Sequence, residues 1–366
     1  MALPLDGVRV IEMGYYTAGP VAGRYLCDLG AEVVRIEPGD GDPTRGAGGR
    51  ASAGWSFLYG QNNAGKQSIS LDLKAADSLQ TMGGLLAQAD VFLCSFPPEV
   101  MARLHLAPDD CRQFNQRLVY CGVSGFGLDS PPAQRALDMA IQAQAGMMNL
   151  TGHDGRPTKI GISICDDLAA QTATFGILAA LVERDASGCG QLVDVAIYDA
   201  AVWATEHRWP SVLQQPPFPD QLGNSDPSEG VEDVLRCSDG RIAISLPWGG
   251  TNSQLSALLG ETDGSVTPSE ALEMLRRWAS TLTTTRAVTE LEVAGVVCAP
   301  VRSISEVLDT SEVVAGGLLD VPEGGMPAAI NSPLVIDGQR LRPVGPAPSL
   351  NEHDPGLWGR WGSREA

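Results

Sequence analysis

The stretch that decides the fold is VRVIEM (8–13), followed by AGPVAGRYLCDL (18–29), Gly30 and AEVVRIE (31–37). The first and last segments are short apolar runs typical of buried strands. The middle segment is helical, with a proline near its first turn, and Gly30 ends it. Strand, helix and strand in this order form a βαβ unit, which implies a parallel sheet with right-handed crossovers.

The same alternation continues beyond this unit. Apolar runs typical of strands lie at 68–73, 90–96, 118–123 and 191–197, and helical stretches lie at 75–89 and 166–183. Strands that alternate with helices form parallel sheets with helices on both faces. The sequence therefore predicts an α/β protein whose large domain holds a Rossmann-like parallel sheet.

Prolines divide the chain. Residues 209–228 contain five prolines, which is the composition of a linker, and a domain boundary is expected there. Beyond it, two short strands over 234–244 are joined at the turn Ser238-Asp239-Gly240, and helical periodicity follows over 268–297. The segment from 322 onward is again rich in proline and glycine. The expected organisation is a large domain over 1–210, a linker over 211–228, a smaller α/β domain over 229–325 and a final segment over 326–366.

The chain is strongly acidic. It has 366 residues, with 25 Lys and Arg against 44 Asp and Glu, and a net charge of −19. Nucleic-acid binding needs a clustered excess of basic residues, so nucleic acid is excluded as a main partner. Residues 1–150 carry 11 basic and 15 acidic side chains, while 151–366 carry 14 and 29. An anionic ligand is therefore better tolerated by the first part of the chain.

The sequence predicts a cytoplasmic protein. The opening MALPLDGVRVIEM lacks the basic segment and apolar run of a signal peptide, and no stretch approaches the ~20 apolar residues of a membrane span. The eight cysteines contain no C-x-x-C pair, which favours free buried thiols in a reducing compartment. With four scattered histidines and no metal-binding motif, no metal site is expected.

Two near-matches to known motifs fail at a required glycine. The turn after the first strand reads MGYYTAG (13–19) instead of G-x-G-x-x-G, so NAD and FAD binding are discounted. The stretch GVSGF (122–126) nearly matches the nucleophile elbow G-x-S-x-G, but Phe126 stands at the second glycine. A strand ending in a tight glycine-rich turn is therefore favoured there over a catalytic serine.

Lysine is rare, since 22 of the 25 basic residues are arginine, and two of the three lysines flank one predicted strand. In NAGKQSISLDLK (63–74), alternation along the strand places the even-numbered residues from Ser68 to Lys74 on one face. Lys66 and Lys74 at a sheet edge suit a phosphate-bearing ligand, where ammonium groups act as point charges. They equally suit a solvated strand end, and the residues alone leave both interpretations open.

The remaining candidates for chemistry are two neighbouring carboxylates. GISICDD (161–167) is an apolar, strand-like approach that ends in Asp166 and Asp167 at the start of a helix. Aspartate at a helix N-terminus is ordinarily a cap, and only one of the pair is needed for that. The other could point into a cleft, where the helix N-terminus keeps it ionised and nucleophilic. The residues alone favour the cap.

At these residues the chain resembles the class III (CaiB/BaiF-type) CoA-transferase family over nearly its whole length. Each matching segment is weak by itself, but their order and spacing together are specific. The segments are Leu5, Gly7 and RVIE (9–12), AGP (18–20), LCDLGAEVVRIE (26–37), GD (41–42), TRG (44–46), NAGKQSISLDLK (63–74), ADVFLCSF (89–96), RL (103–104), SGFG (124–127), DMAIQA (138–143), LGN (222–224) and SDG (238–240).

The resemblance implies a large Rossmann-like domain built from both chain ends, with a smaller α/β domain inserted and 326–366 returning to the large one. It implies a homodimer whose two subunits interlock as linked rings. It also implies that the substrates are an acyl-CoA and a carboxylic acid, with coenzyme A as substrate and no tightly bound cofactor.

Carried over residue by residue, the resemblance makes Asp166 the catalytic aspartate, ten residues before Gly176 of GILAAL (176–181), and leaves Asp167 as the cap. The positions implied to bind CoA are Leu71, Lys74, Phe96 and Arg103 for its adenine and phosphates, Ser95 at the family's usual Asn, and Thr17, Ala18 and Pro38 along the same cleft.

The resemblance also implies the chemistry. A carboxylate attacks the acyl thioester and releases CoA thiolate, which leaves a mixed anhydride; returning thiolate gives an aspartyl-CoA thioester, which the acceptor acid attacks in turn. Backbone amides at the start of the helix are the expected hydrogen-bond donors to each oxyanion.

Some positions depart from the family pattern. Thr17 stands where the family often has Gln, and Ala170 where it often has Gly. The racemase branch has His at the position of Leu137, which argues against two-base proton exchange. Two alternatives stay open beside CoA transfer: an acyl-CoA racemase or isomerase that pairs Asp166 with His153, and a CoA-binding protein without turnover.

Overall fold

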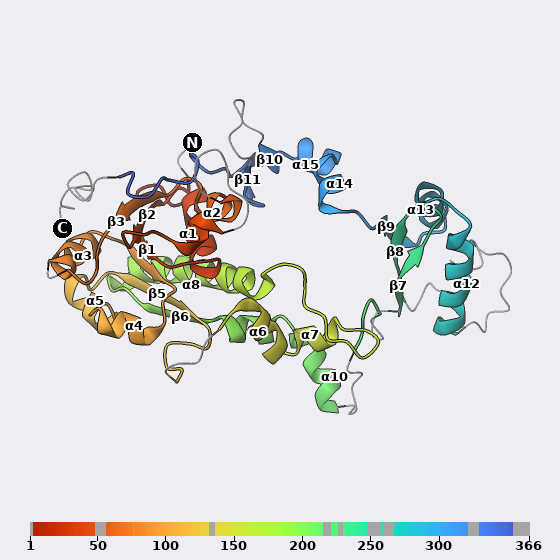
Figure 1. Cartoon of the computed structure of the whole chain (residues 1–366), viewed down its shortest axis with the longest axis horizontal. Coiled ribbons are helices and arrows are strands. Elements are labelled where there is room, and N and C mark those ends of the chain that lie inside the picture. The colour runs from red at the N-terminus through yellow and green to blue at the C-terminus, as the bar shows by residue number, and fades with distance from the viewer. Residues whose placement is uncertain are drawn as a thin grey trace. The chain divides into compact units, whose positions relative to one another are not determined.

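The protein is built around one six-stranded parallel sheet, seen in the computed structural model of the chain (Figure 1). Its strands lie in the order β3-β2-β1-β4-β5-β6, and all neighbouring pairs run parallel. The predicted parallel sheet is therefore confirmed. The order reverses between β1 and β4, as in doubly wound nucleotide-binding sheets. The strands are β1 (Arg9–Met13), β2 (Glu32–Glu37), β3 (Gln67–Ser70), β4 (Val91–Cys94), β5 (Val119–Ser124) and β6 (Leu192–Ala196).

The structure describes residues 3–47, 56–75, 77–131, 136–214, 221–225, 230–247, 258, 267–320 and 329–353. The predicted linker over 211–228 is therefore described only up to Gln214 and over 221–225. The final segment over 326–366 is described only from 329 to 353.

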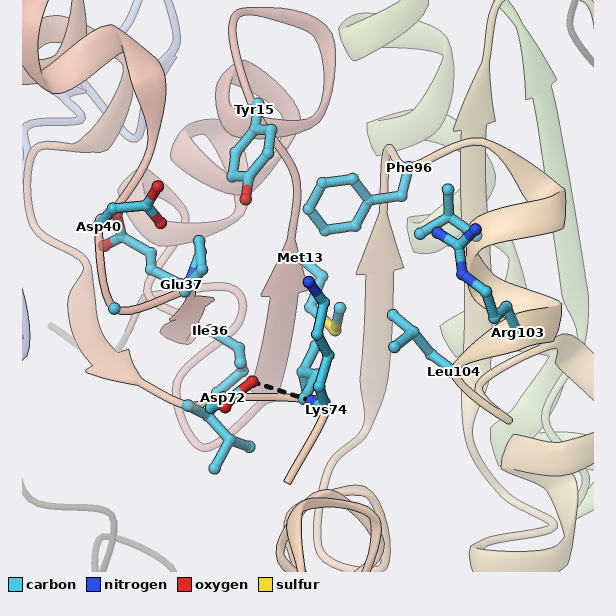
Figure 2. A pocket seen from close by; sticks show the side chains of 15 residues that line it. Met13, Tyr15, Ile36, Glu37, Asp40, Asp72, Lys74, Phe96, Arg103 and Leu104 are labelled. Atoms are coloured by element: carbon cyan, nitrogen blue, oxygen red, sulfur yellow. Dashed lines mark hydrogen bonds between the residues drawn. The ribbon is translucent and has the colours of Figure 1, made fainter. Parts of the chain in front are cut away.

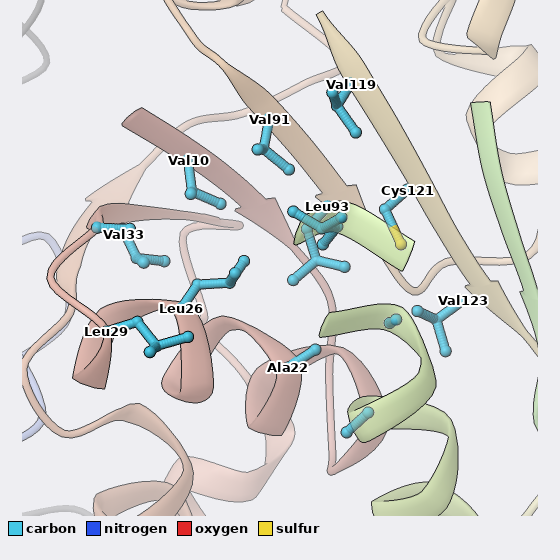
Figure 3. Close-up of a cluster of buried hydrophobic side chains, with 14 of the residues drawn as sticks. Val10, Ala22, Leu26, Leu29, Val33, Val91, Leu93, Val119, Cys121 and Val123 are labelled. Carbon is cyan, nitrogen blue, oxygen red and sulfur yellow. The ribbon is translucent and has the colours of Figure 1, made fainter. Parts of the chain in front are cut away.

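Helices cover both faces of the sheet. On one face, α1 (Ala18–Asp28) and α8 (Ile164–Ser187) pack against strand residues that include Val10 and Val33 (Figure 3). On the other face, α3 (Ser78–Leu86) and α5 (Pro108–Phe114) pack against residues of the opposite parity, such as Ile11 and Val34. Because successive side chains point to opposite faces, a strand covered on both sides reads as a continuous apolar run.

The predicted helix over 75–89 is observed as the shorter α3, and the one over 166–183 as the longer α8. The other helices of this part of the chain are α2 (Phe57–Asn63), α4 (Pro98–Arg103), α6 (Asp138–Gln144), α7 (Met147–Leu150), α9 (Ile197–Trp203) and α10 (Trp209–Gln214), with 3₁₀ turns η1 (Pro43–Gly46) and η2 (Glu206–Arg208).

Strand β3 ends at Ser70, before the predicted end at 73. The carboxylate of Asp72 accepts a hydrogen bond from the backbone N–H of Lys74 (3.0 Å), which belongs to a turn rather than to a strand. The predicted alternation therefore does not extend to Lys74, and this lysine lies beyond the sheet edge.

Helix α8 is the central helix of the fold. Its buried face consists mainly of alanines and contacts α1, α9, β5 and β6. Among the described helices it is the one whose length and apolar composition would suffice for a membrane span, and 44% of its most apolar window is buried inside the protein. Packing against the sheet accounts for its apolar character. Its small alanine side chains let the neighbouring helices approach closely.

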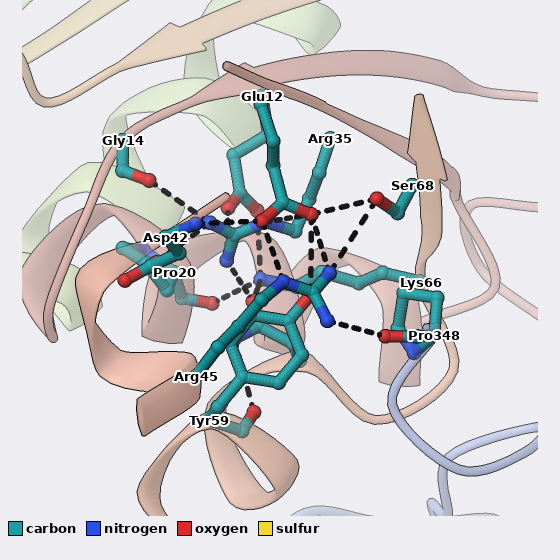
Figure 4. Close-up of polar contacts among 12 residues, drawn as sticks. Glu12, Gly14, Pro20, Arg35, Asp42, Arg45, Tyr59, Lys66, Ser68 and Pro348 are labelled. Atoms are coloured by element: carbon teal, nitrogen blue, oxygen red, sulfur yellow. Dashed lines mark hydrogen bonds and ion pairs between the residues drawn. The ribbon is translucent and has the colours of Figure 1, made fainter. Parts of the chain in front are cut away.

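A buried network of charged side chains joins β1, β2 and the start of β3 (Figure 4). Lys66 Nζ lies 2.7 Å from Glu12 Oε2, and Arg35 lies 2.8 Å from a carboxylate oxygen of Asp42 and 3.3 Å from one of Glu12. The network is thus anchored on β1 and β2, with Lys66 reaching in from the residue before β3.

The rest of the network surrounds Glu37, the last residue of β2. Arg45 donates to Glu37 at 2.6 Å, and Ser68 Oγ donates to the same carboxylate at 2.7 Å. Burial by itself would raise the pKa of Glu37, but the hydrogen bond and charge of Arg45, with Arg35 and Ser68, lower that pKa to about 2. With three acids and three bases, the charges of the network cancel where water is excluded, as a buried ion requires.

Lys66 is only 3% exposed, and its ammonium also donates to the backbone oxygen of Pro20 (2.6 Å) and to Asn63 Oδ1 (2.9 Å). Neither interpretation of the paired lysines therefore applies to Lys66: it is neither a phosphate ligand nor a solvated side chain. The question of a phosphate ligand is left to Lys74.

The C-terminal segment covers the free edge of β3. Asn351 Oδ1 accepts from the backbone N–H of Ser70 (2.9 Å), and His353 exchanges hydrogen bonds with the backbone of Ser68 (3.1 and 3.2 Å). Arg45 of the buried network donates to the backbone oxygen of Pro348 (3.1 Å). Edge strands expose unpaired backbone groups, and this segment satisfies them.

Contacts divide the chain into two compact units. The larger comprises Met1–Met147, Ile160–Pro216 and Ser311–Ala366, and the smaller comprises Met148–Lys159 and Pro217–Thr310. The smaller unit thus takes a segment that precedes α8 and ends at Thr310 rather than at the expected 325. The larger unit also contains a short helix, α15 (Ser311–Val314), and two short antiparallel strand pairs. These are β10 (Leu319–Asp320) with β11 (Ala329–Ile330), and β12 (Val335–Ile336) with β13 (Gln339–Arg340).

The smaller unit holds a three-stranded antiparallel sheet in the order β7 (Gly230–Arg236), β8 (Arg241–Pro247), β9 (Val297–Pro300). The predicted turn at Ser238-Asp239-Gly240 joins β7 to β8. The predicted helical stretch forms two helices, α12 (Pro268–Ser280) and α13 (Thr284–Val293), which pack on the sheet through an apolar cluster. A short helix, α14 (Ile304–Leu308), follows.

Two glycine-to-alanine substitutions in helices test how tightly α1 packs on the buried network. A Cβ at Gly23 in α1 would overlap Glu12 Oε2, whereas a Cβ at Gly84 in α3 meets nothing within 4 Å. We expect Gly23→Ala to lower the free energy of unfolding by roughly 2 to 4 kcal/mol, because the displaced carboxylate is paired and buried. The matched control Gly84→Ala raises it by about 0.5 to 1 kcal/mol.

Urea unfolding of the two variants measures both effects. Equal destabilisation by Gly23→Ala and Gly84→Ala would contradict the tight contact between α1 and Glu12.

Candidate active site

Two pockets lie at the carboxyl edge of the six-stranded sheet, where the strand order reverses between β1 and β4. Their lining residues follow directly after these strands: Tyr15 after β1, and Ser95 and Phe96 after β4. Open α/β sheets bind ligands at this reversal point, because the diverging loops leave a crevice there. All described lining residues belong to the larger unit.

The first pocket, here called the lysine pocket, has a volume of about 810 Å³ (Figure 2). It brings together five of the residues that the sequence assigned to CoA: Pro38, Leu71, Lys74, Phe96 and Arg103. Lys74 follows the turn after β3, and Arg103 lies in the last turn of α4. Both cations are exposed, and the lining is otherwise mostly apolar apart from the carboxylates Glu37, Asp40 and Asp72.

The second pocket, here called the aspartate pocket, has a volume of about 820 Å³. It contains the other residues that the sequence assigned to the site: Thr17, Ala18, Ser95 and Asp166. Leu137 and Asp138 also line it. The predicted site residues are therefore divided between two pockets, with the cations in one and the catalytic candidate in the other.

Tyr15 lines both pockets and so marks their junction. Its ring packs edge-on against Phe96, with ring centroids 4.7 Å apart and an angle of 88° between the planes. Burial, with the nearby carboxylates Asp42, Asp40 and Glu37, raises the pKa of Tyr15. The phenol is thus neutral near physiological pH, and a ligand that spans both pockets passes a hydrogen-bonding group.

Asp166 lies in the first turn of α8, and its pKa is raised to about 7. Burial is the largest cause, followed by the charges of Asp138 and then Asp167. The helix N-terminus was expected to keep this carboxylate ionised, which requires a low pKa, but the pKa of Asp166 is raised instead. Desolvation and two negative neighbours outweigh the helix dipole, which is worth about 1 kcal/mol or less at such a position.

Asp138, rather than Asp167, accepts hydrogen bonds from the start of α8. Asp138 Oδ1 accepts from the backbone N–H of Cys165 (2.8 Å) and, at longer range, from that of Asp166 (3.4 Å). Its other oxygen accepts from Gln142 Nε2 (2.6 Å). The predicted cap at Asp167 is corrected accordingly. Two of the backbone amides at the start of α8, the expected donors to an oxyanion, are therefore engaged by this carboxylate.

Ser95 lies at the end of β4 against the start of α1. A Cβ at Gly14 or Gly19 would overlap its side chain, so both glycines allow a close approach of the two elements. The hydroxyl of Ser95 is buried and has no hydrogen-bond partner among the described residues. The structure therefore places Ser95 at the wall of the aspartate pocket rather than with Lys74 and Arg103.

Comparisons with known proteins bear on the whole chain. The family model of CoA-transferase family III matches residues 5–354. The chain belongs to this family. It is therefore a CoA-transferase, and the predicted resemblance is confirmed.

Curated relatives cover nearly the full length. A succinate–glutarate CoA-transferase of Agrobacterium fabrum is 32% identical, over 96% of this chain and 94% of the relative. A probable fatty acyl-CoA transferase of Mycobacterium tuberculosis, Rv3272, is 30% identical, over 96% of this chain and 97% of the relative. Among solved structures, a CaiB/BaiF family protein from Brucella suis matches with a TM-score of 0.88 at 28% identity, covering 99% of this chain and all of that one.

Two members of the candidate site were missed at the sequence level. Tyr15 was noted only within the turn that lacks G-x-G-x-x-G, although an aromatic residue after β1 at a reversal point is a natural wall for a ligand. Asp138 was seen only as part of a family segment. Its contact with α8 crosses 27 residues, and no local pattern signals a cap supplied from that distance.

Neutralising Asp138 should make Asp166 more acidic. Asp138→Asn keeps an oxygen that can accept from Cys165 but removes the negative charge, so we expect the pKa of Asp166 to fall by about one unit or more from its value near 7. Carbon NMR of aspartate-labelled protein, assigned with Asp166→Asn, follows this titration.

Two further substitutions serve as controls. Asp167→Asn should lower the same pKa less, because Asp167 is the smaller of the two charge effects. Glu99→Gln neutralises another carboxylate of the same pocket that does not contribute to the shift, and it should leave the titration unchanged. A titration that is the same in Asp138→Asn and wild type would contradict the assigned cause.

Proposed function

We propose that the protein transfers CoA from an acyl-CoA to a carboxylic acid, with Asp166 as the nucleophile. The observation that carries this proposal is the pair of adjoining pockets at one sheet edge. The lysine pocket offers exposed cations beside apolar side chains, and the aspartate pocket offers a half-buried carboxylate. A CoA thioester has this same division, with phosphates at one end and the reactive acyl group at the other.

In this proposal the lysine pocket binds the nucleotide end of CoA. Lys74 and Arg103 pair with its phosphates, since both reach the pocket as exposed cations. Leu71, Pro38 and Phe96 supply apolar surface for the adenine. The pantetheine arm then passes Tyr15 toward the aspartate pocket, along the wall formed by Thr17, Ala18 and Ser95.

The first half of the reaction leaves CoA bound to Asp166 as a thioester. A carboxylate oxygen of Asp166 attacks the thioester carbon; the C–S bond breaks and CoA leaves as a thiolate, giving a mixed anhydride. The thiolate then attacks the aspartyl carbon of the anhydride. The donor acid leaves as a carboxylate, and Asp166 carries CoA as a thioester.

The second half reverses these steps with the acceptor. The acceptor carboxylate attacks the aspartyl thioester, which releases the thiolate and forms a second anhydride. The thiolate attacks the acceptor's acyl carbon, and the new acyl-CoA leaves with Asp166 restored as a carboxylate. No atom or electron is needed from outside the two substrates and Asp166.

The raised pKa of Asp166 has two consequences for this chemistry. A more basic carboxylate is a stronger nucleophile once it is ionised, and at pH values above about 7 most of it is ionised. The neighbouring charges of Asp138 and Asp167 disfavour the free carboxylate but not its neutral ester-like adducts. The site therefore favours forming the anhydride and the thioester over the resting state.

The same raised pKa also suits a general base, which keeps the racemase or isomerase alternative in view. Leu137, which is 70% exposed, replaces the histidine of the racemase branch. His153, the partner considered for Asp166 in this alternative, belongs to the smaller unit. Solvent deuterium that enters the α-carbon of an acyl-CoA without exchange of CoA would favour this alternative.

Trapping the covalent intermediate tests the nucleophile. Incubation with succinyl-CoA, acetyl-CoA and a fatty acyl-CoA in turn, followed by digestion, should place a CoA-sized, hydroxylamine-sensitive adduct on the peptide that contains Asp166. Asp166→Ala should lose the adduct and lower turnover by about 10⁴-fold or more.

The matched control is Asp167→Asn, which changes the adjacent carboxylate and should keep the adduct. An adduct that persists in Asp166→Ala would contradict the assignment. Absence of any adduct in the wild type, with CoA still bound, would favour a CoA-binding protein without turnover.

A second prediction concerns the lysine pocket. We expect Lys74→Met and Arg103→Met each to raise KM for the acyl-CoA by about five- to tenfold with little change in kcat, because they contact the non-reacting end of the substrate. Arg112→Met is the control: Arg112 is an exposed cation of α5 that pairs with Asp109 and lines neither pocket. Steady-state kinetics measures both parameters, and an equal rise of KM in the control would indicate a general charge effect.

A further inference from the structure

Ser124, the central residue of the GVSGF stretch, has a buried hydroxyl that the fold does not use. It is the last residue of β5 and only 8% exposed, and its Oγ has no hydrogen-bond partner among the described residues. It also lines the aspartate pocket. The serine of this near-match to a nucleophile elbow is therefore a pocket residue to which the proposed function gives no role.

Ser95 Oγ, in the wall of the same pocket, is likewise buried without a partner among the described residues, whereas the other buried serines use their hydroxyls. Ser56 Oγ donates to Thr44, Ser68 Oγ to Glu37 and Ser78 Oγ to Ala75, while Ser332 Oγ accepts from Leu334. Leaving such a group unpaired costs about 1 to 3 kcal/mol, so an unpaired hydroxyl at a pocket wall indicates a ligand group.

Ser124 and Asp166 are brought to one pocket by neighbouring elements. Strand β5 packs against α8, and Phe126, two residues after Ser124, belongs to the same apolar cluster as Ile164 and Cys165 at the start of α8. A substrate group held next to Asp166 therefore lies in the cavity that Ser124 lines.

The reaction needs a donor in this cavity. When a carboxylate attacks a thioester or an anhydride, negative charge develops on the carbonyl oxygen. The amides of Cys165 and Asp166 already donate to Asp138, and the pocket's other charged side chains, Glu99 and Asp138, are acids. Among the described lining residues there is no lysine, arginine or histidine.

We propose that Ser124 is a catalytic residue that donates a hydrogen bond from Oγ to the carbonyl oxygen of the reacting acyl group. The bond strengthens as charge develops on that oxygen during attack by Asp166, and Ser124 keeps its proton throughout. This inference rests on the proposed function of Asp166 and adds to it the group that stabilises the transition state.

Ser124→Ala tests the inference because its effects on rate and on stability should have opposite signs. We expect kcat to fall by about 10²-fold, as on removal of other oxyanion donors, with CoA affinity unchanged. The melting temperature should stay the same or rise, because the substitution removes an unpaired buried hydroxyl. The assay uses succinyl-CoA and glutarate, the acids named for the Agrobacterium relative, or the most active pair of the donor series.

Two further variants make the result specific. Ser78, the first residue of α3, donates its buried hydroxyl to the backbone oxygen of Ala75 and lines neither pocket. Ser78→Ala should therefore lower the melting temperature and leave kcat unchanged. Ser124→Cys keeps the shape with a weaker donor and should give a kcat between those of wild type and Ser124→Ala.

Different outcomes overturn different statements. An unchanged kcat in Ser124→Ala, with the adduct still on Asp166, overturns the role of Ser124 and leaves the proposed function standing. A loss of kcat that is matched by losses of CoA affinity and melting temperature also overturns it, since that pattern is structural. An adduct on Ser124 itself, or none on Asp166 in an active wild type, overturns the proposed function and this inference together.

Discussion

The structure depends on pairing six charged side chains where almost no water reaches them. These are Glu12, Glu37, Asp42, Arg35, Arg45 and Lys66. Removing one partner would leave a buried charge uncompensated, at a cost of several kcal/mol, so the members hold one another in place. Because they come from β1, β2, the approach to β3 and η1, their pairing also fixes the loops that carry Tyr15 and Pro38. The wall of the lysine pocket is therefore set from inside the fold.

The candidate site follows the opposite rule. Asp166 has two like charges nearby and no described cation in its pocket, and burial raises its pKa. Its folded-state pKa lies above the ordinary value, so between about pH 4 and 7 the ionised group detracts increasingly from stability as pH rises. The protein therefore compensates charge fully in the network and leaves it uncompensated in the aspartate pocket. Such local instability is typical of sites whose groups must react.

The sequence predicts the fold well because its signals are local. The apolar runs of β1 and β2 and the glycine after α1 establish the βαβ unit. The family resemblance assigns Asp166, Lys74 and Arg103 to one site, and the structure divides them between two pockets. Features that cross the chain could not be predicted in this way. Lys66 looks like a surface lysine until Glu12, 54 residues away, is brought to it. Asp138 likewise reaches α8 from another element.

The segment that carries Asn351 and His353 has a consequence for how the chain folds. Its contacts with Ser68 span 285 residues, so they are among the last to form during synthesis. Until then the edge of β3 is open, with backbone groups that can pair with another chain. During synthesis β3 is therefore an unpaired edge strand, which the segment around His353 later covers. Docking of this segment competes with aggregation through that edge.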